Sequence, residues 1–168
     1  MGRLARILKH RWRDDADVAR ALPLAALARL EAQVAASEGQ HTGQIRLCVE
    51  GGLPLSYLWR SATARQRALT LFGKLRVWDT EHNNGVLIYL LLAEHAIEIV
   101  ADRGLTRHLP ASAWQPIVAR LQAALGAGRF EEGLSQAVGV VDGVLVQHWP
   151  RAAGEAYPNE LPDRVVRL

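Results

Sequence analysis

Polar side chains of several kinds gather around two short apolar runs in the middle of the chain. The longer run covers residues 85–93, and the second, residues 97–100, alternates around Glu98. The groups that flank the two runs are carboxylates, amides, an imidazole and a guanidinium: Asp79, Glu81, His82, Asn83 and Asn84 before the first, Asp102 and Arg103 after the second. Carboxylate and amide oxygens suit a hard divalent cation such as calcium or magnesium. Zinc would favour more closely spaced histidines, which this stretch lacks.

Two strands must position these groups. Short apolar runs bounded by Gly, Asn and Asp are typical of strands. The connection at residues 93–95 is too short for a crossover, so we predict an antiparallel hairpin. In a hairpin the end of the second strand lies beside the start of the first. Asp102 and Arg103 are therefore expected to lie near residues 79–84.

A preceding strand and helix extend the predicted group. We expect a strand at residues 45–49 and a helix at residues 63–75, which Thr63 and Gln66 begin as a capping box. Together with the strand at 86 they form a right-handed βαβ unit, in which the parallel strands start at the same edge. His41 and Glu38 then join that edge. We call the predicted set the rim: Glu38, His41, Asp79, His82, Asn83, Asn84, Asp102 and Arg103.

The rim also has a purely structural interpretation, which the sequence leaves open. Asn-Asn-Gly is ordinary turn chemistry, and Asp79 could cap a turn. Asp102 and Arg103 could form an exposed ion pair of little energetic weight. His41 and His82 could be ordinary surface or capping histidines.

The rest of the chain predicts one α/β domain between two less regular ends. We expect further helices at residues 23–38, 112–125 and 130–148, covering both faces of a buried sheet. Residues 53–60 are expected to be irregular. The tail at 151–168 is expected to be irregular too, with Val165 and Val166 laid on the domain. The predicted division is a basic segment at 1–22, a domain at 23–150 and the tail at 151–168.

Composition and the absence of certain motifs exclude several classes of protein. The chain of 168 residues carries a net charge of +3 and has one cysteine, Cys48, which excludes an internal disulfide and is expected to be buried and inert. No Gly-x-Ser-x-Gly elbow and no Gly-x-Gly-x-x-Gly fingerprint occurs. No apolar run approaches the roughly 18 to 20 residues that span a bilayer, and no secretory signal is evident. The expected location is the cytoplasm, with membrane association as an open alternative.

The first thirteen residues form a basic amphipathic segment. Leu4, Ile7, Leu8 and Trp12 fall on one helical face, and Arg3, Arg6, Lys9, Arg11 and Arg13 surround it. Such a segment could dock on its own domain, lie on an anionic membrane surface or touch nucleic acid. No recognition motif or aromatic platform supports nucleic acid, which we do not expect as a partner.

Several short motifs resemble the TPM domain family, also called the TPM phosphatase family. They are Gly43-Gln44-Ile45, Arg67-Ala68, Leu71-Phe72, Asn84-Gly85-Val86-Leu87-Ile88, Asp102-Arg103-Gly104 and Phe130-Glu131-Glu132-Gly133-Leu134. The resemblance covers about residues 23–150 and is strongest to a short bacterial branch, in which residues 77–84 have their counterpart. It implies a three-layer α/β/α sandwich with a small mixed sheet of about four strands. The origin of the fourth strand is not evident.

Two functions follow from the resemblance and the rim together. Members of the similar branch are encoded beside LemA-type membrane proteins, which implies an interaction module with a LemA-type partner. The resemblance also implies a metal-dependent acid phosphatase acting on phosphate monoesters. Asp79 and Asp102, with Asn83 or Asn84, would then hold calcium or magnesium. Arg103 would bind a phosphate oxygen, and His82 or His41 would be the general acid.

Overall fold

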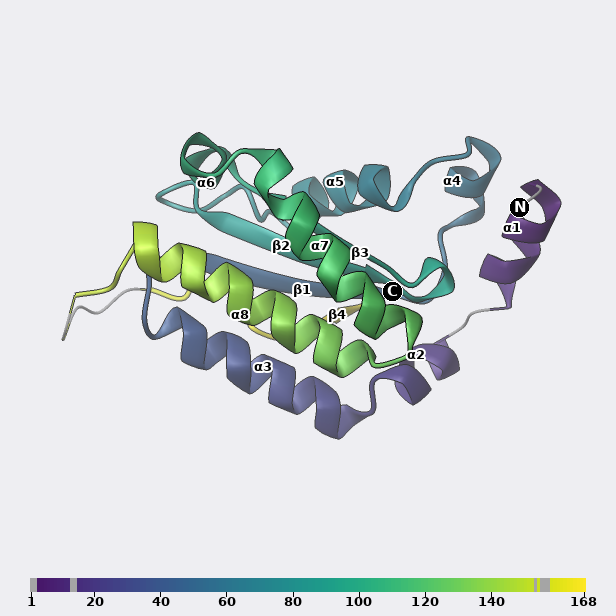
Figure 1. Ribbon diagram of the computed structural model, residues 1–168, viewed down its shortest axis with the longest axis horizontal. Coiled ribbons are helices and arrows are strands. Elements are labelled where there is room, and N and C mark those ends of the chain that lie inside the picture. Colours follow the sequence, from purple (N-terminus) through teal and green to yellow (C-terminus); the bar gives the residue numbers. More distant parts are fainter. Residues whose placement is uncertain (1–2, 13–14, 153, 155–157) are drawn as a thin grey trace.

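The computed structural model describes residues 3–12, 15–152, 154 and 158–168 (Figure 1). One mixed sheet of four strands, in the order β3-β2-β1-β4, lies at its centre. The elements follow along the chain as α1 (Arg3–Arg11), α2 (Asp15–Ala21), α3 (Leu24–Glu38), β1 (Gln44–Glu50), α4 (Leu55–Trp59), α5 (Ala64–Lys74), β2 (Gly85–Leu91), η1 (Leu92–Glu94), β3 (Ala96–Ala101), α6 (Arg103–His108), α7 (Ala111–Gly126), α8 (Phe130–His148) and β4 (Val166–Arg167).

The three central strands pair as predicted. β1 and β2 are parallel, with Gln44 opposite Gly85, which confirms the βαβ unit. β2 and β3 are antiparallel, with Val86 opposite Ala101, which confirms the hairpin. The short turn η1 joins them. All seven residues of β2 are buried, as expected of a central strand that helices cover on both faces.

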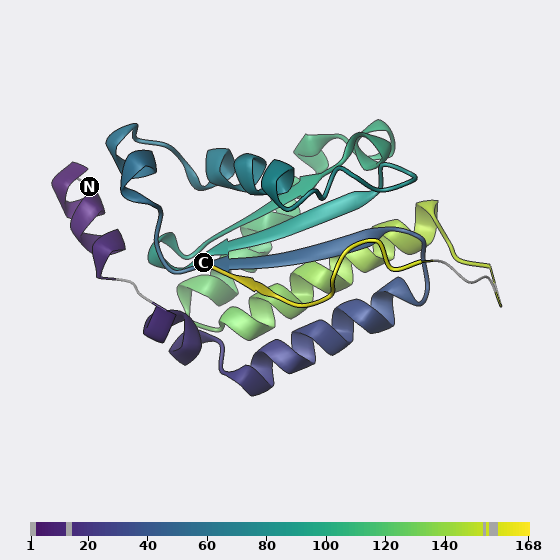
Figure 2. The ribbon, with the colours of Figure 1, turned by 180° about the vertical axis from the view of Figure 1, so that it is seen from behind.

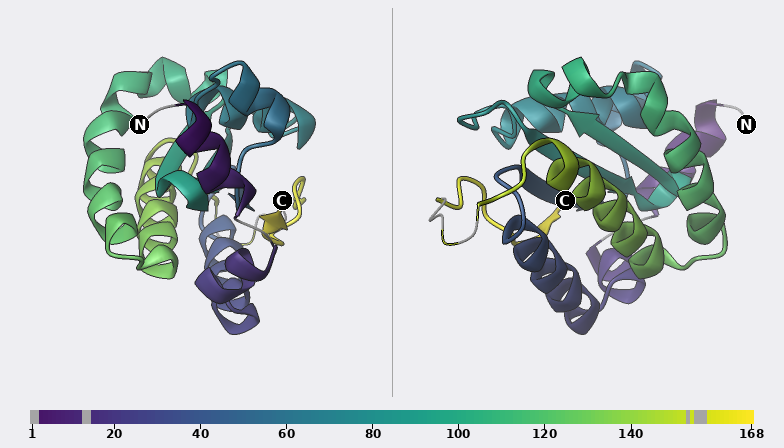
Figure 3. Two further views of the ribbon diagram at one scale, coloured as in Figure 1. Left: turned by 90° about the vertical axis from the view of Figure 1, so that its right-hand side faces the viewer. Right: turned by 60° about the vertical axis from the view of Figure 1, so that its left-hand side comes forward.

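Helices cover both faces of the sheet, so the predicted three-layer sandwich is confirmed (Figures 1 and 3). Alternate residues of β2 face the two sides. Val86, Ile88 and Leu90 pack with α2, α3, α7 and α8. The residues between them, Leu87, Tyr89 and Leu91, pack with α4 and α5. The capping box of α5 is also present, since Thr63 and Gln66 each accept a backbone N–H of the other.

Three short elements differ from the expectation. Residues 53–60 are not irregular, because α4 begins directly after Pro54 and buries its own Leu58 against the sheet. The helix α6 follows β3 without a loop, since Asp102 caps its first turn. The fourth strand is β4, which lies parallel to β1 with Cys48 opposite Val166 (Figure 2). Val166, expected to lie on the domain, is thus part of the sheet, but a two-residue strand is too short to show the alternation that would predict it.

A buried polar network lies on the α5 face of the sheet. Arg67 donates two hydrogen bonds, of 2.9 and 2.7 Å, to the two carboxylate oxygens of Glu50, and the Tyr89 hydroxyl donates a third of 2.7 Å. The Arg67 guanidinium also lies 4.9 Å from the ring centroid of Tyr57. Beside this network, burial raises the pKa of the Cys48 thiol to about 12, as expected of an inert cysteine.

The basic segment at the start of the chain forms α1, although Met1 and Arg13 lie outside the described residues. Only Ile7 of the predicted apolar face packs against the body, together with the buried His10. Leu4, Leu8 and Trp12 are exposed by 80%, 60% and 80%. Among the helices of the described ranges, none is long and apolar enough to cross a membrane.

Candidate functional site

The start of β2 and the start of α6 bring four rim residues together. Arg103 Nε donates a hydrogen bond of 2.8 Å to Asn83 Oδ1, and the Gly104 N–H donates one of 2.9 Å to the Asn83 carbonyl. The Asp102 N–H donates to the Gly85 carbonyl over 3.0 Å. A Cβ at Gly104 would lie 2.3 Å from the Asn83 carbonyl oxygen, so this close approach requires glycine. Asn83, Asn84, Asp102 and Arg103 therefore form one cluster.

Two buried oxygens in this cluster have no hydrogen-bond partner: Asn84 Oδ1 and Asp102 Oδ2. The Asn84 side chain is fully buried, with Nδ2 3.5 Å from Thr42 Oγ1. The other oxygen of Asp102 accepts the Arg103 N–H over 2.6 Å and caps α6. Burial raises the pKa of the Asp102 carboxyl above its ordinary value, opposed by the Arg103 N–H and the Arg103 charge. Buried acceptors without a hydrogen-bond partner are unusual in proteins, so these two oxygens are the candidate ligands of the cluster.

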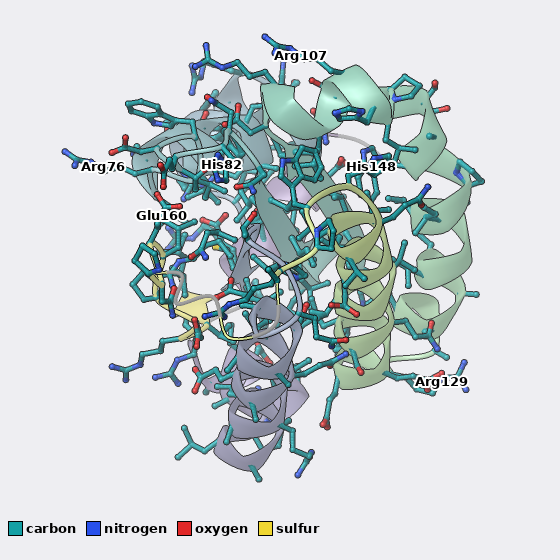
Figure 4. All side chains as sticks on the ribbon, turned by 90° about the vertical axis from the view of Figure 1, so that its left-hand side faces the viewer. Arg76, His82, Arg107, Arg129, His148 and Glu160 are labelled. Carbon is teal, nitrogen blue, oxygen red and sulfur yellow. The ribbon has the colours of Figure 1, made fainter. Side chains whose placement is uncertain are left out.

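Asp79 and His82 do not join these two oxygens in a metal cluster. No three His, Cys, Asp or Glu side chains within the described ranges are grouped so that they could hold a metal ion. Asp79 is about half exposed, with Oδ2 4.0 Å from Arg76 Nη1. His82 is exposed in the same loop, and the neighbouring Glu81 N–H donates to Glu160 (Figure 4). The loop before β2 is thus held partly by the C-terminal segment, which sequence spacing could not predict.

His41, another predicted rim residue, is buried in a polar group separate from this cluster. Its Nε2 donates to Ser37 Oγ over 2.9 Å, and Ser37 Oγ donates to Asp142 Oδ1 over 2.6 Å. A nucleophilic triad needs the carboxylate at Nδ1 and the serine at Nε2. Here Ser37 and Asp142 both lie on the Nε2 side, and the serine proton is directed at the carboxylate. Burial lowers the pKa of His41. Because the Ser37 hydroxyl donates to Asp142 and not to His41, we interpret the group as a structural hydrogen-bond network.

Glu38 accepts a backbone hydrogen bond at the start of β1. Its Oε1 accepts the Ile45 N–H over 2.7 Å, and burial raises the pKa of the carboxyl to about 8. Asp163 adds to this increase through its negative charge. With Gln44, Arg151 and Asp163, Glu38 lines a pocket of about 150 Å³.

Several residues at this end of the molecule have no signal in the sequence. Thr80 accepts the Asn84 N–H through its hydroxyl at 3.1 Å, and Thr42 approaches the Asn84 amide. At the ends of α6 and α8, His108 and His148 stack with ring centroids 4.8 Å apart, and Trp149 packs edge-on against His108. Figure 4 shows His148 on the opposite side of the strand ends from His82. These residues come from distant segments, and no local spacing marks them.

The cluster fits a divalent cation only in part. Asn84 Oδ1 and Asp102 Oδ2 are oxygen donors of the kind that calcium and magnesium prefer, and both lack a partner. Asn83 Oδ1 is occupied by Arg103, and Asp79 is near Arg76 instead. Arg103 itself is exposed at the first turn of α6, where a guanidinium can reach an anion from solvent. The cluster thus contains two unpartnered oxygens of the type that binds hard cations, and one exposed guanidinium.

Comparison with known proteins agrees with this architecture. The sequence model of the TPM domain family matches residues 16–144. The solution structure of the BA42 protein from the psychrophilic bacterium Bizionia argentinensis is similar, with a TM-score of 0.74 and 21% identity over 87% of this chain and 94% of that one. The N-terminal domain of a P. gingivalis protein has a TM-score of 0.60 and 21% identity over 78% and 82% of the two chains. No curated protein matches the sequence.

Proposed function

Because the chain belongs to the TPM domain family, we propose that it is an interaction module whose rim binds a divalent cation. The observation that carries the proposal is the pair of buried, unpartnered oxygens, Asn84 Oδ1 and Asp102 Oδ2. Leaving such acceptors unsatisfied costs on the order of 1–3 kcal/mol each, so a ligand that satisfies both would be bound favourably.

The proposed ligands are fewer than the rim as first predicted. Asn84 and Asp102 would hold calcium or magnesium, and water would complete the shell, as both ions commonly retain water. Asn83 would join only if Arg103 released its Oδ1. Asp79 is left out, because its carboxylate is half exposed beside Arg76. A bound cation would also favour the ionised form of Asp102, offsetting the effect of burial on its pKa.

Titration calorimetry with calcium, magnesium and zinc tests this assignment. The decisive variant is Asp102→Asn, which removes the charge but keeps an oxygen to cap α6. Asp79→Asn is the matched control, because it removes an exposed carboxylate from the neighbouring loop. We expect the wild type and D79N to bind calcium or magnesium and D102N to lose the binding. Absence of binding in the folded wild type, or a loss in D79N alone, would contradict the assignment.

We also propose that the partner is a membrane protein of LemA type. The support for it is the resemblance of residues 77–84 to the bacterial branch encoded beside such proteins. Co-purification of the chain with a co-expressed LemA-type protein, with calcium and with EDTA, tests the link. Retention with calcium and release with EDTA would connect the partner to the rim. A LemA-type protein that is not retained under either condition would exclude it as a partner.

A metal-dependent acid phosphatase is the second candidate, and the exposed guanidinium of Arg103 beside the two orphaned oxygens favours it. In this proposal Arg103 binds a phosphate oxygen, and His82, exposed in the adjoining loop, donates the proton to the leaving group. The residues would orient the ester, while the cation would supply Lewis-acid stabilisation.

Hydrolysis of p-nitrophenyl phosphate in acid buffer, with and without calcium or magnesium, distinguishes the two candidates. We expect Arg103→Met to abolish turnover if the chain is a phosphatase. Arg107→Met is the control, since Arg107 is exposed one turn further along α6. Turnover that survives R103M, or that falls equally in R107M, would remove Arg103 from the catalytic role.

A further inference from the structure

The helix α1 turns polar side chains toward the body of the protein. Arg6 Nε and His10 Nε2 both donate to Glu94 Oε1, over 2.8 and 3.0 Å. Arg6 also donates to the Ala62 carbonyl over 2.6 Å, and His10 Nδ1 accepts the Leu53 N–H over 2.9 Å. A Cβ at Gly52 would lie 2.5 Å from the His10 carbonyl oxygen, so the backbones approach closely. These contacts fix which side of α1 faces outward.

The outward side of α1 is apolar. Leu4, Leu8 and Trp12 follow one another at intervals of four residues, which places them in one stripe, and they are exposed by 80%, 60% and 80%. A surface helix ordinarily buries its apolar stripe and exposes its polar residues. In α1 the arrangement is reversed for these three side chains. This reversal makes the stripe a candidate docking surface.

The neighbouring helix α4 extends this surface. α4 packs against α1, and its Leu55 and Trp59, again four residues apart, are exposed by 45% and 59%. Figure 3 (left) shows both helices at the same end of the molecule. Of the nine large apolar side chains exposed in the described ranges, five lie here. We call them the α1–α4 face: Leu4, Leu8, Trp12, Leu55 and Trp59.

The charged side chains that α1 and the end of α4 contribute to the α1–α4 face are positive. Lys9, Arg11 and Arg60 are exposed beside it, and neither helix contains an acidic residue. The carboxylate that α1 does contact, Glu94, is already bonded to Arg6 and His10. An occupant of this face must therefore offer apolar groups together with negative charge. An anionic lipid surface offers both, with acyl chains below a layer of phosphates.

We propose that the α1–α4 face docks the protein on an anionic bilayer surface. Leu4, Leu8 and Leu55 enter the boundary between headgroups and acyl chains, and Trp12 and Trp59 lie at headgroup level, where indole rings are favoured. Lys9, Arg11 and Arg60 contact the lipid phosphates. The α1–α4 face lies beyond the carboxyl end of β1, whereas the rim lies at the start of β2. A docked molecule therefore presents the rim away from the membrane, and docking needs no cation at the rim.

Co-sedimentation with vesicles of phosphatidylcholine, alone or mixed with phosphatidylglycerol, tests the proposal. The apolar variant is Leu8→Ser with Trp12→Ser. Its matched control is Leu69→Ser with Trp78→Ser, because these side chains are 51% and 50% exposed on α5 and the loop after it. We expect the wild type and the control to sediment with the mixed vesicles. The partition of L8S/W12S should fall by at least about tenfold.

A charge variant and an assembly measurement complete the test. Lys9→Glu with Arg11→Glu should reduce binding to the mixed vesicles, and high salt should weaken the wild type in the same direction. Failure of the wild type to bind mixed vesicles, or equal binding by L8S/W12S, would overturn the proposal. Analytical ultracentrifugation gives the remaining outcome. A dimer that L8S/W12S dissociates, without vesicle binding, would assign the face to a second copy of the chain.

Discussion

Arg103 and Asn83, twenty residues apart, are joined side chain to side chain, with Arg103 Nε donating to Asn83 Oδ1 over 2.8 Å. The bond ties the first turn of α6 to the loop that leads into β2. Asn83 is itself held in the left-handed region, with φ of 51°. Asparagine accepts this conformation more readily than most residues, and here its side chain also orients Arg103. The pair therefore links the shape of the loop to the position of the exposed guanidinium.

Replacing Asn83 separates these two roles. Asn83→Ala should lower the free energy of unfolding by about 1 kcal/mol, because the left-handed conformation is sterically unfavourable for alanine. Asn83→Gly removes the same bond to Arg103 without that penalty, so its stability should stay closer to the wild type. Urea unfolding of the three proteins measures the difference. Equal stability of N83A and N83G would show that backbone strain at this position is unimportant.

Gly104 should be the least replaceable residue of the cluster. A Cβ at this position would lie 2.3 Å from the Asn83 carbonyl oxygen and 2.8 Å from that of His82. Gly104→Ala must therefore push the loop before β2 away from α6, at a cost of about 2 kcal/mol or more. Thermal unfolding measures the loss.

Gly73→Ala provides the matched control for this substitution. A Cβ at Gly73 would meet nothing within 4 Å, and the residue lies inside α5. Alanine should stabilise that helix by up to about 1 kcal/mol. If G104A were as stable as G73A, the close approach of α6 to the loop would not hold the rim together.

The sequence predicted those parts of the fold that depend on local patterns. Three features leave a local signature: the capping box at Thr63 and Gln66, the apolar run of β2 and the short connection from β2 to β3. Parallel pairing of β1 with β2 then follows from the handedness of a βαβ unit. Together these features predict that Asp102 and Arg103 lie beside Asn83, and the structure places them there.

The remaining features depend on contacts between distant segments. Periodicity placed Leu4, Leu8 and Trp12 on one face of α1, but which face turns inward is decided by Glu94, Ala62 and Leu53. Likewise, Asp79 and Asp102 carry the same chemistry in the sequence. In the structure Asp79 is half exposed beside Arg76. Asp102 is buried, and one of its carboxylate oxygens has no hydrogen-bond partner. Spacing along the chain could not distinguish them.

The Glu50–Arg67–Tyr89 network should dominate the stability of the α5 face. Arg67→Met would leave the buried Glu50 carboxylate without its cation, at a cost of about 3–5 kcal/mol. Tyr89→Phe removes one hydrogen bond to the same carboxylate and should cost about 1–3 kcal/mol. Chemical unfolding of each variant gives these values.

An exposed ion pair on the other side of the molecule serves as the comparison. Arg29 donates two hydrogen bonds to Glu131, in the same bidentate form, but both side chains are in solvent. Arg29→Met should therefore change stability little, because water screens the pair. If R29M and R67M lost a similar free energy of unfolding, burial would not explain how much the Glu50–Arg67 pair contributes to stability.

Glu38 should make the stability of the protein depend on pH in a direction opposite to that of a salt-bridged carboxylate. Its pKa is about 8 in the folded state, against an ordinary value of 4.5. Between these values the folded protein keeps a proton that the unfolded chain has released. The free energy of unfolding should therefore fall as the pH rises from 4.5 to 8, by up to about 1.4 kcal/mol per pH unit from this group.

Glu38→Gln isolates that contribution. The amide oxygen can still accept the Ile45 N–H, but the side chain no longer titrates. We expect the stability of E38Q to exceed that of the wild type increasingly as the pH rises toward 8, and the two to converge near pH 4.5. Asp163→Asn should shift the wild-type transition to lower pH, because its charge helps to raise the pKa of Glu38. Urea unfolding across this range, with carbon-13 NMR titration of the Glu38 carboxyl, measures both effects. Parallel pH profiles for the wild type and E38Q would show that Glu38 is ionised in the folded protein throughout the range.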